Sequence, residues 1–405
     1  MALNSMSFQQ SATLINDVLE QMTGQSSLAP VDEAEFVAVG TTLLQTGYDA
    51  LNTAVSQVLS RSIYSARAYS PIYPSIERDS IQWGGIVRKV TTLDLDFMDD
   101  KAYNVANGNG ISDCDPFLVN RQKSVQFNWY GGNTKELLVT VTEQQLRQAF
   151  SSSADFGSFM AAQAVNLTNQ INQKIEAESR VVVNNMIAAA CYEGGDRVVH
   201  LLTEYKDETG NATITAANYL SEDEFVPFAK WLYGRLNTLK AFMKERTNKY
   251  HANITSYNGV SLTKPIMRHT PAENLNIWMI TDFMNQVDSS ALSGIYNQQL
   301  LSIGGYELVN YWQSIAAPKT VQVVPNILDV DGTCYTPEQE GEPVPVTCEN
   351  VIGILFDDEA LGITVMNEDV RSIENPRGRY FNNWYNWVCR YYNDQTENFV
   401  VLQLD

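Results

Sequence analysis

The sequence predicts an α+β fold, and three observations support this class. A long helical pattern covers residues 158–193, and strand-like patterns precede it over residues 81–141. Strand patterns return over residues 351–402, and the segment between, 197–359, mixes helices and strands. Separate runs of strands and helices are typical of α+β proteins. Since no catalytic motif accompanies the long helix, the pattern first indicates a structural protein.

The composition limits the classes of function that the chain can have. The chain has 405 residues, 44% of them hydrophobic and 18% charged, which is typical of a globular chain with two or three domains' worth of core. The net charge of −20 argues against a nucleic-acid binder, because phosphate contacts need an excess of Lys and Arg. An acidic surface can still lie beside DNA without binding it.

The cysteines indicate reduced thiols in a protein made in the cytosol, because they are scattered, odd in number and form no C-x-x-C pair. A disulfide between Cys334 and Cys348, which flank one loop, is the alternative. The first ten residues lack a basic patch followed by an apolar core, so no signal peptide is expected. The sequence contains no run of about 18 apolar residues, so no membrane span is predicted. The five cysteines are Cys114, Cys191, Cys334, Cys348 and Cys389.

The N-terminal region predicts two helices, over residues 14–22 and 36–59, separated by the break at 24–30. Neither has enough apolar surface to form a core alone, so each must dock on this chain or on a neighbour. Residues 61–80 contain Pro71 and Pro74 and predict an extended connector.

Residues 81–97 and 123–141 predict two long strands joined by a polar loop over 99–117. Both faces of the first strand are mixed, so neither resembles a complete core face. Gly131 and Gly132 interrupt the second strand and predict a bend or bulge. Because a two-stranded arm is only marginally stable alone, this arm predicts a partner surface.

The long helix over residues 158–193 contains neither Pro nor Gly, and its apolar residues recur every three or four positions. At 1.5 Å per residue it would be roughly 50 Å long. Gly194 and Gly195 predict its end. We expect its apolar stripe to pack on residues 384–392 and 399–402.

Between this helix and residue 350, the patterns alternate. A capping-box sequence at Ser221 predicts the start of a helix, and a Pro- and Glu-rich loop covers 335–347. The predicted strands are 198–205, 276–281 and 321–324, and the further helical patches are 282–287 and 292–302.

The C-terminal region predicts strands over 351–356 and 363–367, followed by a β-hairpin with an aromatic face over 384–402. Asn393 and Asp394 mark the expected turn. Aromatic residues interleaved with Arg can stack nucleic-acid bases, but the acidic net charge favours packing in the core or between subunits.

Motifs for catalysis are lacking in the sequence. The histidines His200, His251 and His269 have no metal-ligand spacing, and no nucleophile-elbow, Walker or dinucleotide motif stands between a strand and a helix. Asp94 and Asp96 would share one face of a strand, and solvent-exposed charge explains them better than a cation site.

The closest approach to a metal motif is formed by Asp329, Asp331, Gly332 and Glu338, which match positions 3, 5, 6 and 12 of a calcium loop. Ile327 stands at position 1 and has no ligating side chain. The flanking sequences are not helical, so a turn is the preferred interpretation. Asp329, Asp331 and Glu338 remain weak metal candidates, and we expect no catalytic residue, metal or cofactor.

The order of these elements resembles the HK97-type fold of tailed-bacteriophage major capsid proteins. The ending ENPRGRYFNNWYNWVCRYYNDQTENFVVLQLD, residues 374–405, is similar to the C-terminal segment of such proteins from short-tailed phages, including gut phages. The resemblance covers nearly the whole chain in architecture but is motif-specific only over this segment. No Lys–Asn spacing assigns the covalent crosslink that some relatives form.

The resemblance implies five parts. These are an N-terminal arm and connector (1–75), an extended hairpin or E-loop (76–142), a spine-helix part of the peripheral domain (143–215), an axial domain (216–350) and return strands (351–405). It implies a non-enzymatic subunit that self-assembles into hexamers and pentamers of an icosahedral shell around double-stranded DNA. Scaffold, portal and decoration proteins are candidate partners. Assembly in the host bacterial cytoplasm and residence in the virion would follow.

Three alternatives stay open at this stage: a nanocompartment shell of the encapsulin type, a portal or tail protein, and an enzyme that uses paired acids. The contents of the particles would distinguish a nanocompartment shell from a capsid. Ring-shaped assemblies would indicate a portal or tail protein. Two acids converging in a cleft would be required for the third. The triangulation number and the host are not encoded in any readable motif.

Overall fold

The computed structural model describes part of the chain as two compact units. The first contains the described parts of residues 131–179 and 363–391, and the second those of 84–130, 180–362 and 392–405. The predicted N-terminal helices lie outside the described residues, as does most of the hairpin loop. The described residues are 76, 87–95, 97, 117, 119–130, 132–145, 153–262, 264–294 and 306–405.

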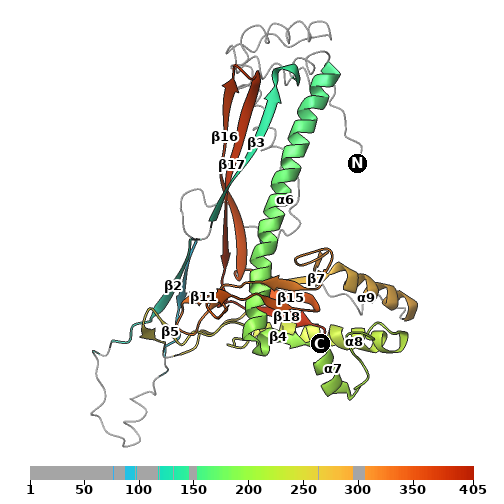
Figure 1. Ribbon diagram of the computed structural model, residues 1–405. Coiled ribbons are helices and arrows are strands. Elements are labelled where there is room, and N and C mark those ends of the chain that lie inside the picture. Colours follow the sequence, from blue (N-terminus) through green and yellow to red (C-terminus); the bar gives the residue numbers. More distant parts are fainter. Residues whose placement is uncertain are drawn as a thin grey trace, which may run out of the picture. The chain divides into compact units, whose positions relative to one another are not determined.

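The first unit combines a three-stranded sheet with most of the long helix α6 (Ser153–Glu193). The sheet has the order β16 (Leu361–Asn375), β17 (Tyr380–Asn393) and β3 (Gly132–Thr142). Glu178 of α6 accepts a hydrogen bond from Asn133 of β3 at 3.4 Å and pairs with Lys135 of the same strand at 3.2 Å. The helix therefore lies beside this sheet (Figure 1).

The long helix predicted from the sequence is confirmed. It begins at Ser153, five residues earlier than predicted, and ends at Glu193. Gly194 adopts a φ of 66°, and its N–H donates to the carbonyl of Ala190 at 2.8 Å. A residue with a side chain would be strained in this conformation, which explains why a glycine ends the helix.

The second unit is built on a five-stranded sheet covered by three helices, α7 (Leu201–Thr209), α8 (Glu222–Lys244) and α9 (Thr281–Gly294). Apolar residues from these helices and from β7, β15 and β18 form one buried cluster, so the helices and the sheet share a core. The predicted helix after Ser221 and the strand over 276–281 are confirmed. The strands, in spatial order, are β4 (Val198–His200), β18 (Phe399–Gln403), β15 (Val351–Asp357), β7 (Leu275–Ile280) and β8 (Glu307–Val309).

Short strand pairs complete the second unit. Each is antiparallel, and one of them, β12–β13, lies in the Pro- and Glu-rich loop, where its residues are exposed. The pairs are β5 (Ser256–Tyr257) with β6 (Val260–Ser261), β9 (Val321–Val323) with β14 (Val346–Cys348), β10 (Ile327–Leu328) with β11 (Cys334–Tyr335), and β12 (Glu338–Gln339) with β13 (Glu342–Pro343).

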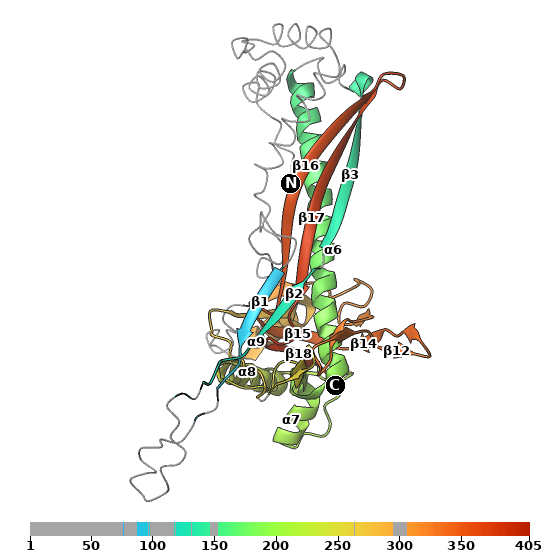
Figure 2. The same cartoon turned by 90° about the vertical axis from the view of Figure 1, so that its left-hand side faces the viewer.

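A β-hairpin of β1 (Val87–Thr92) and β2 (Ser124–Trp129) also belongs to the second unit (Figure 2). The prediction of a single strand over 123–141 was wrong, because this segment contains two strands, β2 and β3. β2 pairs with β1, whereas β3 pairs with β17. The change of partner coincides with Gly131 and Gly132, where the sequence predicted a bend.

Two further predictions were wrong. The strand predicted over 198–205 ends at His200, and its remainder forms helix α7. The predicted C-terminal hairpin does not form, because β17 pairs with β3 while β18 pairs with β15 and, in parallel, with β4. The polar residues between β17 and β18 therefore form a buried turn and not the turn of a hairpin.

Candidate functional site

Five consecutive polar residues between β17 and β18 are buried, although the sequence suggested an exposed turn. None of them is more than 5% exposed. Buried polar groups are costly unless they are hydrogen-bonded, so such a segment requires many partners. We call it the buried polar segment; it consists of Asp394, Gln395, Thr396, Glu397 and Asn398.

The segment is ordered by its own hydrogen bonds and by those of surrounding loops. The Oδ1 atom of Asp394 accepts from the backbone N–H of Thr396 at 3.0 Å and from its hydroxyl at 2.6 Å. Gln395 donates through Nε2 to the carbonyl of Asn326 at 2.6 Å, and Oε1 accepts from the backbone of Leu328 at 3.0 Å. The segment therefore joins separate loops of the second unit.

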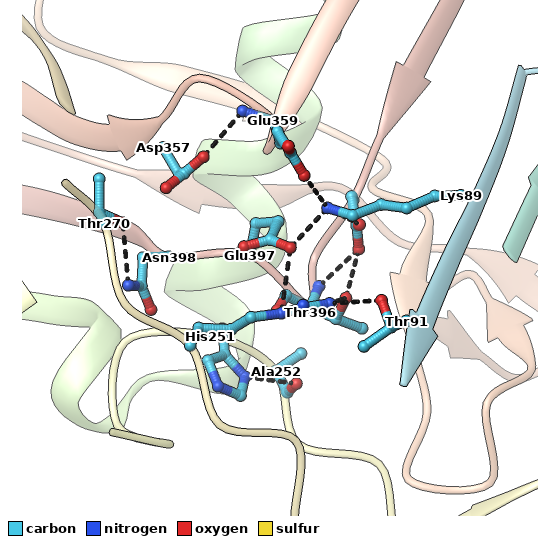
Figure 3. A network of polar contacts seen from close by, with 12 residues as sticks. Lys89, Thr91, His251, Ala252, Thr270, Asp357, Glu359, Thr396, Glu397 and Asn398 are labelled. Atoms are coloured by element: carbon cyan, nitrogen blue, oxygen red, sulfur yellow. Dashed lines mark hydrogen bonds and ion pairs between the residues drawn. The ribbon is translucent and has the colours of Figure 1, made fainter. Parts of the chain in front are cut away.

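Two cations reach the segment (Figure 3). Lys89 of β1 places Nζ 2.5 Å from Glu397, 3.1 Å from Asp394 and 2.9 Å from Glu359. The Nε atom of Arg268 lies 3.0 Å from Glu397. Charge-assisted hydrogen bonds of this kind are the strong ones in a protein interior.

Arg268 also connects the segment to the hairpin. Its Nη2 atom donates to the hydroxyl of Thr91 at 3.0 Å and to that of Thr396 at 3.2 Å. Lys89 and Thr91 lie on the same face of β1, because alternate strand residues share a face. The buried polar segment thus anchors the base of the β1–β2 hairpin.

Burial and ion pairing have opposite effects on the pKa values of Lys89 and Glu397. Burial lowers the pKa of Lys89, but the charges of Asp394 and Glu397 outweigh it, so the pKa stands above its ordinary value. For Glu397, burial raises the pKa to about 7 despite the attraction of Lys89 and Arg268. Lys89 therefore stays charged at neutral pH, while Glu397 titrates there.

A pH dependence of stability follows from Glu397. Its folded pKa of about 7 exceeds the ordinary value of 4.5, so the folded state binds the proton more tightly. We expect its contribution to the free energy of unfolding to fall by up to roughly 3 kcal/mol as pH rises from about 4.5 to 7, then to level off. Urea unfolding at pH 5 and pH 8 measures this slope. Glu397→Gln should flatten it, and an unchanged slope in that variant would contradict the assignment.

Apolar contacts hold the same hairpin face. Leu93, Val125 and Phe127 are buried in a cluster with Ile254 and Ile266. The rings of Phe127 and Tyr257 meet edge to face, with 5.3 Å between their centroids. One face of the hairpin is therefore fixed to its own unit.

The rest of the hairpin presents apolar side chains to solvent. Phe97 is fully exposed, and Phe117, close to the start of β2 in sequence, is 84% exposed. Single exposed apolar residues are common, but several in and beside one hairpin favour an interaction surface. We call this set the exposed hairpin surface; it consists of Val90, Leu95, Phe97, Phe117, Val119 and Tyr130.

Where they are described, the acidic residues singled out from the sequence form no group that could hold a metal ion. Asp94 pairs with Arg246 at 2.6 Å, and Asp96 lies outside the described residues. Asp331 accepts hydrogen bonds from the backbone and hydroxyl of Thr333, in the turn between β10 and β11. Glu338 is exposed in β12.

Within the described part of the chain, no group of three or more His, Cys, Asp or Glu residues is arranged to hold a metal ion. The histidines are also apart from one another. His200 contacts Asp405 at 2.8 Å, His269 is exposed, and the Nδ1 atom of His251 lies 3.0 Å from the carbonyl oxygen of Ala252. Burial lowers the pKa of His251, which keeps its ring neutral.

Sequence reasoning missed Lys89, Arg268 and the buried polar segment as one site. The residues are separated by long stretches of sequence, and the turn composition around Asn393 favoured exposure. A usable signal was the close spacing of Asp394 and Glu397 between an aromatic-rich strand and an apolar strand, because burial of both strands would require cations near these carboxylates.

Comparison with known proteins gives a consistent assignment. A family model described as Phi29-like phage major capsid protein matches residues 12–403. A chain in the structure of head fiber and inner core protein gp22 of native bacteriophage P68 aligns with a TM-score of 0.50 and 9% identity, covering 81% of this chain and 83% of that chain. A chain in the capsid structure of Staphylococcus phage Andhra aligns with a TM-score of 0.49 and 11% identity, with the same coverages. Among curated proteins there is no match.

Proposed function

The chain belongs to the Phi29-like phage major capsid protein family, and we propose that its β1–β2 hairpin binds a neighbouring copy in the shell. The protein is a shell-forming component of a virion, and its α+β fold is of the HK97-like class. The family match favours a capsid subunit over a portal protein, a tail protein or a nanocompartment shell. None of the described helices has the length and apolar character needed to cross a membrane.

The observation that carries the hairpin proposal is that its paired strands are anchored while residues beyond their loop ends are exposed. The strands are fixed by Lys89, Thr91 and a small apolar cluster, whereas Phe97 and Phe117 are exposed. Anchoring reduces the entropy lost when the arm binds a partner. Burial of large aromatic side chains in neighbouring subunits contributes favourably to the free energy of binding. The contact recurs for every subunit of the shell.

The finer organisation is also part of the proposal. The subunits form hexamers and pentamers in an icosahedral shell, assembled in the host cytoplasm, around double-stranded DNA. The net charge of −20 supports a wall that does not bind that DNA tightly. Scaffold, portal and decoration proteins are the expected partners. The hairpin corresponds to the E-loop, α6 to the spine helix, and residues 216–350 to the axial domain.

Electron microscopy of the expressed full-length chain, with and without a co-expressed scaffold protein, tests the assembly. We expect closed shells or capsomers of uniform size. Open rings would indicate a portal-like assembly instead. A monodisperse monomer under every condition, scaffold included, would contradict the proposed assembly.

A further inference from the structure

The second unit contains two segments of opposite charge. Residues 230–268 hold eight of the chain's 27 Lys and Arg residues and a single acidic residue, Glu245. Residues 320–362 hold nine Asp and Glu residues and neither Lys nor Arg. A cationic segment of this size is an exception in a chain whose net charge is −20. Surfaces of opposite charge on one molecule favour the contact of one copy with another.

The cationic segment includes the side of α8 that faces away from the core. Lys230 and Lys244 are both exposed, and they lie on the same side of the helix because almost four full turns, roughly 21 Å, separate them. Neither lysine forms an ion pair with another described residue. Burial, and then the charge of Lys244, lowers the pKa of Lys240 one turn earlier. We call Lys230, Lys240 and Lys244 the basic α8 face; a carboxylate brought to it would offset the repulsion between its lysines.

The anionic segment includes the exposed hairpin of β12 and β13. A two-residue turn joins the strands, and its residues Glu340 and Gly341 have positive φ values of 54° and 84°. The N–H of Val344 donates to the carbonyl of Pro337 at 2.8 Å and closes the base of the hairpin. A two-residue turn of this kind fixes the register of its strands. We call residues 337–344 the acidic finger; its exposed carboxylates are those of Glu338, Glu340 and Glu342.

The acidic finger and the basic α8 face lie apart within one subunit. Figure 2 shows β12 on one side of the second unit and α8 on the other. None of the three carboxylates of the finger forms an ion pair with another described residue. Each surface therefore keeps its charge uncompensated by the described part of its own chain, and each has the sign that the other requires.

We propose that the acidic finger of one subunit docks on the basic α8 face of a neighbouring copy in the shell. The carboxylates of the finger pair with Lys230 and Lys244, which selects the correct partner surface and speeds its encounter. A contact between two different surfaces is heterologous, and it closes into a ring where the rotation between copies permits. Capsomers are such rings, so this inference rests on the proposed function and names one of its contacts.

The phosphates of a nucleic acid are the other ligand that a row of lysines can attract. Two observations favour a second copy of the chain instead. The net charge of −20 repels nucleic acid from the molecule as a whole. The acidic finger, in contrast, is present on every copy at the same concentration as the basic α8 face, and its carboxylates are already exposed.

Charge reversal of each surface in the full-length protein tests this contact. Lys230→Glu with Lys244→Glu reverses the face, and Glu340→Lys with Glu342→Lys reverses the finger. We expect either reversal alone to lower the yield of shells in electron microscopy at least about tenfold, because like charges would then meet at every contact. All four changes together should restore at least about half of the wild-type yield, because opposite charges meet again. Circular dichroism should stay unchanged throughout, since all four side chains are exposed.

Asp207→Lys with Glu273→Lys is the matched control for net charge, since both residues are exposed and lie outside the finger. Added to the reversed face, this pair restores the net charge but should not restore shells. Shells at wild-type yield from either reversed protein would overturn the inference and leave the proposed function intact. A folded variant with all four changes that forms no shells would also overturn it, as would equal rescue by the control pair.

A double-stranded DNA fragment tests the nucleic-acid alternative directly. We expect the wild type and the protein with the reversed face to bind the fragment equally weakly in a gel-shift measurement. Binding by the wild type that the reversal abolishes, with shells still formed, would assign the face to phosphate and overturn the inference. A wild type that forms no shells under any condition would overturn the proposed function together with this contact.

Discussion

Replacing Phe97 with aspartate should abolish shell formation while leaving the subunit folded. The Phe97 ring is fully exposed in its own chain, so its loss removes no internal packing. In the proposed contact, the aspartate would place an unpaired charge in an apolar interface, which costs several kcal/mol at each copy. Because a shell repeats the contact many times, we expect closed particles to fall below detection in electron microscopy. Circular dichroism and the unfolding midpoint should match those of the wild type.

Phe97→Leu serves as the conservative control and should retain shells. Phe117→Asp tests a second residue of the exposed hairpin surface and should also prevent shell formation, since Phe117 is 84% exposed. Val330→Asp changes an exposed apolar residue in the turn between β10 and β11, outside the exposed hairpin surface, and should retain shells. If Phe97→Asp and Phe117→Asp both form shells at wild-type yield, the hairpin proposal is refuted, although the proposal that the chain assembles into shells would stand.

Replacing Lys89 with methionine should destabilise the second unit by about 3 kcal/mol, because removing one partner of a buried ion cluster leaves charge uncompensated. The Asp394 side chain is only 1% exposed and that of Glu397 is 6% exposed, so water cannot replace the lost ammonium. Methionine preserves most of the volume and separates the charge effect from packing. Urea unfolding at pH 8 measures the loss. Hydrogen exchange should show reduced protection of the amides of β1 and β2.

Lys249→Met is the matched control for this substitution. Lys249 lies 4.0 Å from Asp196, and both side chains are more than half exposed. A surface ion pair of this kind contributes no more than about 0.5 kcal/mol to the free energy of unfolding. The double variant Lys89→Met with Glu397→Gln should lose less than the sum of the single effects, because the two residues share one cluster. Equal losses from Lys89→Met and Lys249→Met would show that the cluster does not anchor the hairpin.

Regular periodicity made the largest elements predictable. The helix was predicted over 158–193 because its apolar residues repeat at helical spacing over many turns of that range without Pro or Gly. Strand β7 was predicted because six largely apolar residues stand between turn-forming ones. Both signals are local, so a single sequence is sufficient to read them.

The partners of the strands were not predictable by the same means. β17 alternates and the apolar strand β18 follows it closely in sequence, which made a hairpin the natural interpretation. In the structure each pairs with distant strands, and the polar residues between them become buried. The anchor on Lys89 was missed for the same reason, since an isolated lysine in a strand carries no signal of the carboxylates it will meet.

The position of β18 has a consequence for synthesis. This strand lies between β4 and β15 in the sheet, yet it is made after every other described strand. Until residues 399–403 have been made, β4 has no neighbour in the sheet and the apolar residues that will contact β18 stay exposed. The second unit therefore completes its sheet only after these residues have been made, and contacts of such long range form slowly. During that interval the nascent chain is a substrate for chaperones, or for aggregation where chaperones are scarce.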